Sequence, residues 1–478
     1  MSSRRKWLPT MSLRKISSPL GRGLAALILL ASASPLAPPR AQTGNGFGAQ
    51  DRERGREMLK IVREELEKNY YDPTFRGMDV KARFKAAEER IKNAKSNGEI
   101  NSVIAQVLVE LNDSHTYFIP PEKLGVVDYG WRMQVIGDKC YAVDVEPGSD
   151  AEAKGLRVGD EVWSIDGYEP TRENVWKIEY SYKVLKPRPG MRVVVVEEPN
   201  GGQRQLDVMA RISLNAEALI ERVLNIAEDR VSGASRFYEA KDGLLVWKLP
   251  DFETDEKEID EGVKRALGFE SLVLDLRGNG GGYEKALLRL VGQVFDRDVK
   301  IGDIKRRGET RALVAKTRGG GKVFKGRLVV LVDSNSGSAA ELFARVVQLE
   351  KRGVVVGDRS AGKVMRARGF GEAVTRSLPG AFHFTPFAVS ITDADVVMTD
   401  GHSLEGAGVT PDELLLPTGE DLRAGRDPVL ARAAALAGAK LDAETAGSLF
   451  PVIRLKADDL KEKKKNEKKG DGGKGEKP

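Results

Sequence analysis

Apolar residues recur at every third or fourth position in three stretches of the sequence between residues 51 and 111. A period of about 3.6 residues is typical of helices that bury one face. The three stretches are Met58–Leu66, Val80–Ile91 and Val103–Leu111, with a break at Asp72-Pro73. The pattern predicts a small helical N-terminal domain over residues 42–125, which begins with a polar linker.

Between residues 126 and 213 the pattern changes to the alternation of apolar and polar residues that is typical of half-buried strands. Residue pairs that favour turns, such as Pro147-Gly148 and Gly159-Asp160, separate the alternating runs. The predicted strands are Trp131–Ile136, Tyr141–Val145, Glu161–Ile165 and Arg192–Glu197. We therefore expect a β-domain over residues 126–213.

From residue 241 onward, continuous apolar runs alternate with helical stretches, a combination that favours an α/β core. Leu272–Leu276 and Leu328–Val332 predict buried strands, and each is followed by a turn of small residues and then by a helix. Val354–Val356 predicts a third strand. The chain is thus predicted to be a multidomain α+β and α/β protein, with a helical connector at 214–240 and an α/β core with C-terminal helices at 241–455.

The start of the sequence reads as a secretory signal. Basic residues precede the apolar run Leu24–Ala33, and small residues and prolines follow it. The run is about half the ~20 residues that a membrane span needs. We therefore predict a signal peptide over residues 1–41, cleaved after Ala33 or Ala41, and no stable transmembrane anchor. The protein is expected to be exported, to the periplasm or beyond the cell.

The net charge of +6 comes from this leader, which holds seven Lys or Arg and no acid. Without the leader, 70 basic and 71 acidic residues remain, so the composition excludes a nucleic-acid-binding class that depends on a basic surface.

Residues 456–478 hold nine lysines, six acids and several glycines, a composition typical of a disordered tail. Cys140 is the only cysteine, so neither an intrachain disulfide nor a cysteine metal site is expected.

Two strand–turn–helix corners carry the residues best suited to chemistry. Ser338 follows one predicted strand and begins a helix, whose positive end favours a developing oxyanion. The turn Arg277–Gly282 follows another strand, and its glycines allow a backbone N–H to approach a substrate carbonyl. The sequence therefore predicts a nucleophile beside two amide donors, Ala339 and Gly281 or a neighbour of Gly281. Taken singly, such a serine is usually only an N-cap, and such a turn is as easily a phosphate cradle.

The stretch Glu146–Val162 resembles the part of PDZ domains that runs from one strand end through a short helix to the next strand. PDZ domains leave one strand edge open beside a loop of unpaired N–H groups, where a peptide adds as a further strand. The resemblance, over residues 128–213, implies that Tyr129, Gly130 and Trp131 begin a peptide-binding site. The alternative is a structural spacer whose strand edge is covered.

Three segments together resemble the C-terminal processing, or tail-specific, serine proteases. Leu274–Gly282 is similar to their glycine signature, Ser338–Glu341 to their nucleophile segment, and Gly357–Lys363 to the segment that carries their general-base lysine. Lys363 follows Ser338 by 25 residues, which is the family's spacing. The resemblance covers residues 50–415 and implies Ser338 as nucleophile with Lys363 as its base.

One departure from this family leaves a second base open. The family often has a glutamine four residues after the lysine, and Ala367 stands there instead. Ser114-His115 and Glu405 also resemble the Ser-His pair and the acidic member of the tricorn-like proteases, in which histidine is the base. We expect Lys363 to be the base and keep His115 with Glu405 as the alternative. Purely structural roles for His115 and Glu405 are also open.

The resemblance implies an exported serine endopeptidase that cleaves unstructured protein chains through an acyl-enzyme on Ser338. It implies no cofactor and no metal, and its partners are protein or peptide substrates recognised by their C-termini at the PDZ unit, with room for an adaptor protein. The rival interpretation is a catalytically inactive PDZ scaffold on a decayed peptidase fold, and Ala367 is the only residue that favours it.

Overall fold

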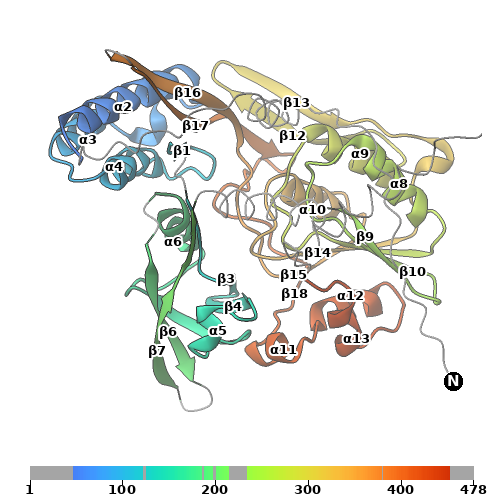
Figure 1. Ribbon diagram of the computed structural model, residues 1–478. Coiled ribbons are helices and arrows are strands. Elements are labelled where there is room, and N and C mark those ends of the chain that lie inside the picture. The colour runs from blue at the N-terminus through green and yellow to red at the C-terminus, as the bar shows by residue number, and fades with distance from the viewer. Residues whose placement is uncertain are drawn as a thin grey trace, which may run out of the picture. The chain divides into compact units, whose positions relative to one another are not determined.

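The computed structural model describes residues 47–121, 125–185, 188–197, 201–214, 234–378 and 381–452. The predicted signal peptide at 1–41, most of the connector at 214–240 and the lysine-rich tail at 456–478 lie outside these residues. From Ala49 onward the described residues form one compact unit. This unit combines helices with several sheets, so the mixed α and β class is confirmed (Figure 1).

Three helices lie where the N-terminal apolar stripes predict them. They are α2 (Ala49–Asn69), α3 (Val80–Lys92) and α4 (Asn97–Val109). The side chains of Asp79 and Ser96 accept hydrogen bonds from the first turns of α3 and α4, which caps both helices. The region is not helical throughout, because Tyr117–Ile119 forms strand β1.

A long hairpin from the C-terminal half of the chain packs beside these helices. Its strands are β16 (Arg366–Leu378) and β17 (Ala381–Met398), and α2 contacts both (Figure 1). Strand β17 also pairs with β1 and with β12 (Val299–Arg306), which pairs in turn with β13 (Glu309–Ala315). Segments about 270 residues apart in sequence, β1 and β17, therefore share one antiparallel sheet, which the sequence patterns did not predict.

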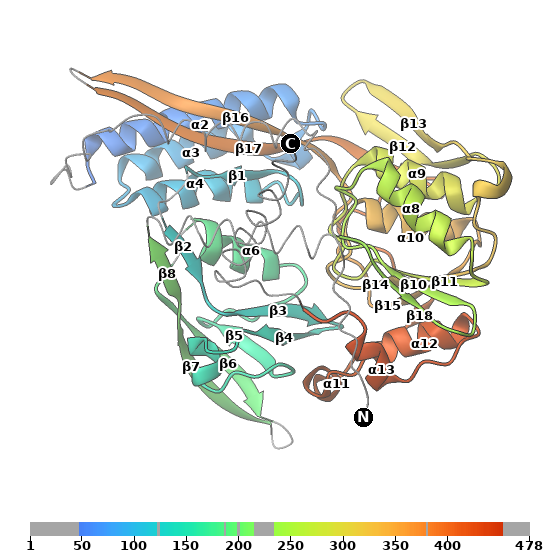
Figure 2. The same ribbon diagram turned by 45° about the vertical axis from the view of Figure 1, so that its right-hand side comes forward.

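The predicted β-domain contains a five-stranded antiparallel sheet in which the strands follow chain order. They are β3 (Trp131–Ile136), β4 (Lys139–Val145), β5 (Glu161–Ile165), β6 (Gly190–Glu197) and β7 (Gly202–Met209). The short helices α5 (Asp150–Ala153) and α6 (Val175–Tyr180) accompany this sheet, and β2 (Gly125–Asp128) pairs with β8 (Arg211–Leu214) beside it (Figure 2). Strand β3 is an edge strand among the described strands, since its sheet partner is β4 alone.

The core is a six-stranded sheet of order β18-β15-β14-β11-β10-β9. The strands are β9 (Arg236–Glu239), β10 (Leu244–Lys248), β11 (Ser271–Asp275), β14 (Arg327–Val332), β15 (Val354–Gly357) and β18 (Glu413–Leu414). All neighbours pair in parallel except β9, which is antiparallel to β10. The prediction of a helical connector is wrong at its described end, because residues 236–239 pair with β10 instead of continuing a helix.

Both faces of the core sheet are covered, which explains why its strands read as continuous apolar runs. Leu272 and Leu274 face the helices α8 (Glu256–Ala266), α9 (Glu284–Val294) and α10 (Ala339–Leu349). Val273 faces the other way, toward α12 (Pro428–Leu436) and α13 (Ala443–Ser448). The remaining C-terminal helix is α11 (Gly419–Ala424). Strand β11 is therefore packed on both faces. This packing fixes the position of the Arg277–Gly282 turn that follows it.

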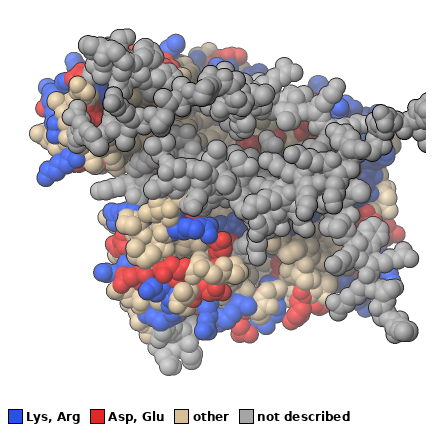
Figure 3. Space-filling view, viewed as in Figure 1, with Lys and Arg blue, Asp and Glu red and all other residues tan. Residues whose placement is uncertain are grey.

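Basic and acidic residues are almost equal in number after residue 41, so we expect a surface of mixed charge. On the face shown in Figure 3, acidic and basic side chains of the described residues lie intermixed at the lower left, without a field of one sign. Among the described residues, no helix is long and apolar enough to cross a membrane.

Candidate active site

The two corners predicted to carry chemistry meet at one edge of the core sheet. Strands β11 and β14 are parallel neighbours, so the turns that follow them lie side by side. The N–H of Gly337 donates to the carbonyl of Asn279 at 2.8 Å, and the side chain of Asn279 donates to the Leu249 carbonyl at 2.9 Å. Asn279 is fully buried, and it fixes the glycine turn against the serine turn.

Ser338 has an unusual backbone conformation for a residue with a side chain. Its φ and ψ angles are 51° and −117°, and non-glycine residues rarely adopt positive φ. Such conformations persist only where the surrounding structure holds them, and they concentrate at functional sites. Helix α10 begins at the next residue, so the hydroxyl stands at the positive end of a helix.

Gly281 lies directly against Ser338. A Cβ atom at Gly281 would come within 2.5 Å of the Ser338 Cβ, and the φ of Gly281 is +104°. A side chain is therefore excluded at this position. The Gly281 N–H donates to the Asn279 side-chain oxygen at 2.9 Å, so this predicted oxyanion donor is engaged. The N–H of Ala339, the other predicted donor, has no partner within the described residues.

Glu341 joins the nucleophile turn to the lysine segment. Its buried carboxylate accepts hydrogen bonds from the N–H of Ser338 at 3.0 Å, the N–H of Lys363 at 2.8 Å, the N–H of Gly362 at 2.7 Å and the hydroxyl of Ser360 at 2.5 Å. Burial raises the pKa of Glu341 to about 7, although these donors favour its ionised form. A carboxylate with four donors fixes both segments in one arrangement.

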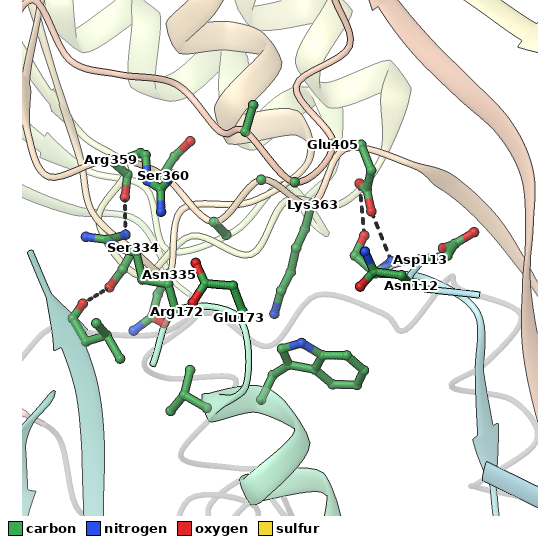
Figure 4. Close-up of a pocket in the computed structure, with 18 of the residues that line it drawn as sticks. Asn112, Asp113, Arg172, Glu173, Ser334, Asn335, Arg359, Ser360, Lys363 and Glu405 are labelled. Atoms are coloured by element: carbon green, nitrogen blue, oxygen red, sulfur yellow. Dashed lines mark hydrogen bonds between the residues drawn. The ribbon is translucent and has the colours of Figure 1, made fainter. Parts of the chain in front are cut away.

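Lys363 lies in the loop between β15 and β16, and its side chain extends into a cavity (Figure 4). Its amine makes no hydrogen bond and no ion pair within the described residues, and Nζ lies 6.0 Å from the centre of the Trp176 ring. Burial lowers the pKa of Lys363 from its usual value, against the influence of the carboxylates of Glu179, Glu341 and Glu405. A lowered pKa is what a general-base lysine requires.

His115 belongs to a second array in the same region. The Ser114 hydroxyl lies 2.6 Å from His115 Nδ1 and donates to Glu405 at 3.1 Å, and Glu405 also accepts from the N–H of Ser114 at 3.0 Å. Asp113 accepts from the N–H of His115 at 2.8 Å and fixes the turn. Burial is the largest cause of the lowered pKa of His115, which keeps the ring neutral at pH 7.

The two arrays are linked, because the N–H of Val364 donates to Glu405 at 3.1 Å. Within the described residues, neither Lys363 nor His115 hydrogen-bonds to the hydroxyl of Ser338. Catalytic hydrogen bonds are often long in unliganded enzymes, so this geometry leaves both bases open. Sequence reasoning assigned no role to Glu341, although its position three residues into the helix is the signal of a capping box.

A cavity of about 530 Å³ lies between the turn after α4, strand β3, helix α6 and the core loops that carry Lys363 and Glu405. Lys363 and Glu405 line it from the core (Figure 4). Ser114 lines it from the turn after α4, and Trp176 lines it from α6. Gln134 of β3 lines it as well, and its side chain donates to Asp333 at 2.9 Å. Of the predicted catalytic residues, Lys363 and Glu405 line this cavity, whereas Ser338, Ala339, Gly281 and His115 are not among its lining residues.

The predicted peptide-binding residues lie at a second, smaller pocket of about 30 Å³. Tyr129 and Trp131 line it, both largely buried, and the Tyr129 hydroxyl donates to the Arg188 carbonyl at 2.9 Å. Gly130 has a φ of +70°, and a Cβ there would come within 2.4 Å of the Ser149 Cβ.

The described residues contain no group of three or more His, Cys, Asp or Glu that could hold a metal ion.

Comparison with known proteins identifies the class of the core. Residues 244–415 match the model of peptidase family S41, which confirms the predicted resemblance to these proteases. The chain is 26% identical over 300 residues to the tail-specific protease of Haemophilus influenzae, an alignment that covers 59% of this chain but only 41% of that protein. It is 24% identical over 382 residues to the chloroplastic C-terminal processing peptidase of Tetradesmus obliquus, covering 74% of this chain and 75% of the relative.

Solved structures of other proteins share the fold of this chain. A mutant of CPAF superposes with a TM-score of 0.60 at 15% identity, and mature CPAF with 0.57 at 17% identity, each over 78% of this chain and 95% of the other. At these identities the likeness concerns the fold alone. The support for a serine peptidase comes from the family match and the curated relatives.

Proposed function

We propose that the protein is a serine endopeptidase that cleaves unstructured protein chains, with Ser338 as its nucleophile. The observation that carries this proposal is the contact between Gly281 and Ser338, where a glycine turn meets a strained serine at the head of a helix. A serine that served only as an N-cap would need neither the positive φ nor the adjacent glycine.

In the proposed reaction, the neutral amine of Lys363 takes the proton of the Ser338 hydroxyl as Oγ bonds to the scissile carbonyl carbon. The Ala339 N–H stabilises the resulting oxyanion, together with a neighbouring amide of the glycine turn, or with the Gly281 N–H once it leaves the Asn279 side-chain oxygen. The leaving amine takes the proton as the C–N bond breaks, and an ester to Ser338 remains. Water then hydrolyses this ester and restores the hydroxyl.

Lys363 is the first choice of base because its amine is unpaired within the described residues and burial lowers its pKa. The second choice is His115. Because the Ser114 hydroxyl donates to Glu405, its oxygen can accept from Nδ1–H, and this tautomer leaves Nε2 unprotonated and available as a base. Glu405 would then accept the proton of the Ser114 hydroxyl and so position that oxygen beside the imidazole, whereas in a Ser-His-Asp triad the acid bonds the histidine directly. Both assignments keep Ser338 as nucleophile.

We further propose that the sheet β3–β7 acts as a PDZ unit that receives substrate C-termini, on its own or with an adaptor protein. The open edge of β3, with Tyr129 and Trp131 at the small apolar pocket, supports this role. The mature protein is proposed to act after export and removal of residues 1–41, in the periplasm or outside the cell, because the leader has the order of a secretory signal.

The test is hydrolysis of an unfolded protein, such as reduced and alkylated casein, by the purified chain and by Ser338→Ala. The wild-type protein should produce fragments, and Ser338→Ala should produce none while melting at a similar temperature. If neither protein cleaves the substrate but the β3–β7 unit binds peptides, the inactive scaffold is the correct interpretation.

A further inference from the structure

Charged side chains surround Arg277, the residue that begins the glycine turn. Its guanidinium donates from Nε and Nη2 to the two oxygens of Asp275, at 2.9 Å in both cases. It donates also from Nη1 and Nη2 to the two oxygens of Asp427, at 2.9 Å and 2.7 Å. Asp275 ends β11 and Asp427 immediately precedes α12, so one guanidinium joins the strand, the turn and a C-terminal helix.

Asp275 holds the main chain of Arg277 as well as its side chain. Its Oδ1 accepts from the Arg277 N–H at 3.0 Å, and Lys248 Nζ donates to the Arg277 carbonyl at 2.6 Å. Lys248 Nζ also lies 3.3 Å from Asp275 Oδ1. Burial alone would raise the pKa of Asp275, but the charges of Arg277 and Lys248 hold it well below its usual range. On the strand side, an ionised carboxylate therefore holds Arg277 at neutral pH.

Asp427 belongs to a different part of the chain. It lies beyond residue 415, where the match to peptidase family S41 ends. Helix α12, which it precedes, packs with Val429 and Leu430 on the face of the core sheet opposite α10 (Figure 2). The N–H of Asp427 donates to the carbonyl of Ala443 at 2.8 Å, so the start of α13 is joined to the same point. Through Asp427, the C-terminal helices are thus connected to the glycine turn.

Asp427 also caps its own helix, and the two tasks have different requirements. Its Oδ1 accepts from the N–H of Leu430 at 2.9 Å, which satisfies one of the free donors of the first turn. Asparagine, serine or threonine would cap the helix about as well. Only a carboxylate presents two equivalent oxygens to the paired N–H groups of a guanidinium. The cap alone therefore does not account for an acid that is bonded twice to Arg277.

The glycine turn is held at both ends. At its start, the two carboxylates fix Arg277. At its other end, Gly281 lies against Ser338, where a Cβ on the glycine would come within 2.5 Å of the serine Cβ. Only the segment Gly278–Gly280 separates Arg277 from Gly281, so a displacement of Arg277 is transmitted to the amides beside Ser338. A displacement of about 1 Å can lower a rate by about 10²-fold.

We propose that Asp427 is a positioning residue for the peptidase reaction. By holding Arg277, it keeps the amides of the glycine turn at the distance from Ser338 at which they stabilise the oxyanion. This inference rests on the proposed function and adds to it a role for the C-terminal helices. An oxyanion donor acts in the transition state, so a misplaced turn lowers kcat and leaves KM nearly unchanged.

Asp427→Asn is the test variant, because asparagine keeps the cap of α12 and loses one of the two oxygens that accept from Arg277. Hydrolysis of fluorescently labelled, unfolded casein measures the effect, with melting curves to show that the protein is folded. We expect kcat to fall by at least about tenfold, a part of the ~10²–10³-fold loss that follows removal of an oxyanion donor. KM should stay within about twofold of the wild-type value.

Asp442→Asn is the matched control. Asp442 caps α13 in the same way, since it accepts from the Thr445 N–H at 2.7 Å, but its side chain bonds Thr445 and not Arg277. This variant should leave kcat unchanged. Hydrogen exchange measured by mass spectrometry gives a readout that does not depend on activity. Exchange in the segment 277–282 should be faster in Asp427→Asn than in the wild-type protein, and unchanged in Asp442→Asn.

A double variant tests whether the effect passes through the guanidinium. In an Arg277→Lys background, Asp427→Asn should lower kcat by a smaller factor than it does in the wild-type protein. Equal factors in both backgrounds would overturn the inference, and so would a folded Asp427→Asn protein with wild-type kcat and unchanged exchange. Both results leave the peptidase function intact. A wild-type protein that does not cleave unfolded casein would overturn the proposed function and this role with it.

Discussion

The backbone N–H of Ser338 donates a hydrogen bond to the carbonyl of Lys363 at 2.8 Å. The residues proposed as nucleophile and base are 25 positions apart in sequence, yet their main chains touch. Glu341 adds a second link, since its carboxylate accepts from the N–H groups of both residues. These bonds fix the two backbones and leave the Lys363 amine to be placed by its own side-chain torsions.

Replacing the proposed base should separate the two mechanisms. Lys363→Ala is expected to lower kcat by about 10²–10⁴-fold, the usual effect of losing a general base. Lys363→Arg should be as inactive, because a guanidinium stays protonated and cannot accept the proton. Hydrolysis of a fluorogenic peptide measures both effects, with melting curves to show that the variants are folded.

His115→Ala is the companion variant. If Lys363 is the base, this change should act mainly through stability, because alanine removes the ring whose Nδ1 contacts the Ser114 hydroxyl and keeps the backbone N–H bonded to Asp113. A folded His115→Ala protein without activity, beside an active Lys363→Ala, would assign the base to His115 and the orienting role to Ser114.

The pH dependence of kcat/KM gives an independent test. A lysine base acts only when neutral, so activity should rise as pH increases through the lowered pKa of Lys363 and should persist at alkaline pH. Burial lowers the pKa of His115 below 6.5, so a histidine base would give a plateau that is already reached at neutral pH. A profile with its midpoint below 6.5 contradicts the lysine assignment.

Gly281→Ala should strongly reduce turnover. The added Cβ would lie 2.5 Å from the Ser338 Cβ, at a φ of +104°, so the glycine turn and the nucleophile must separate. A displacement of about 1 Å can cost about 10²-fold in rate. Gly280→Ala is the control, because nothing lies within 4 Å of a Cβ at that position. Equal activity of the two variants would remove Gly281 from the site.

Glu341→Gln should lower kcat by about 10²-fold through misplacement of Ser338 and Lys363. The same variant also tests how the protonation of Glu341 makes the folding stability depend on pH. The folded pKa of Glu341 is raised from 4.5 to about 7, so the stability that this group contributes is present at low pH and is lost as pH rises toward 7. The melting temperature of Glu341→Gln should therefore lie furthest below that of the wild-type protein near pH 5 and approach it at pH 8. Glu350→Gln, at the other end of α10, is the control for kcat and should leave it unchanged.

Local patterns predicted the elements that bury one regular face. The stripe ending at Leu111 gives helix α4, and the apolar run at Leu272 gives strand β11 of the core sheet. The two reactive corners were predicted for the same reason, because small residues directly after a buried strand stand out. Lys363 and Ser338 were paired by their resemblance to a family, and the structure adds the hydrogen bond between their main chains.

Contacts between distant segments could not be predicted from local pattern. Strand β1 near Phe118 depends on pairing with β17 near Val389, about 270 residues later in the chain, and no periodicity records that contact. The engagement of the Gly281 N–H by Asn279 is likewise a matter of turn geometry, which a run of glycines leaves undetermined. The same holds for the four donors around Glu341, which come from two segments.

Labelling by a fluorophosphonate probe tests the central claim, that Ser338 is an activated nucleophile. The probe forms a stable phosphonate ester with serine hydroxyls that a base and an oxyanion site activate. After reaction and digestion, peptide mass spectrometry should place the adduct on Ser338 and on no other serine, and Ser338→Ala should remain unlabelled. Folded wild-type protein that stays unlabelled, or that carries the adduct on a different serine, would contradict the proposed mechanism.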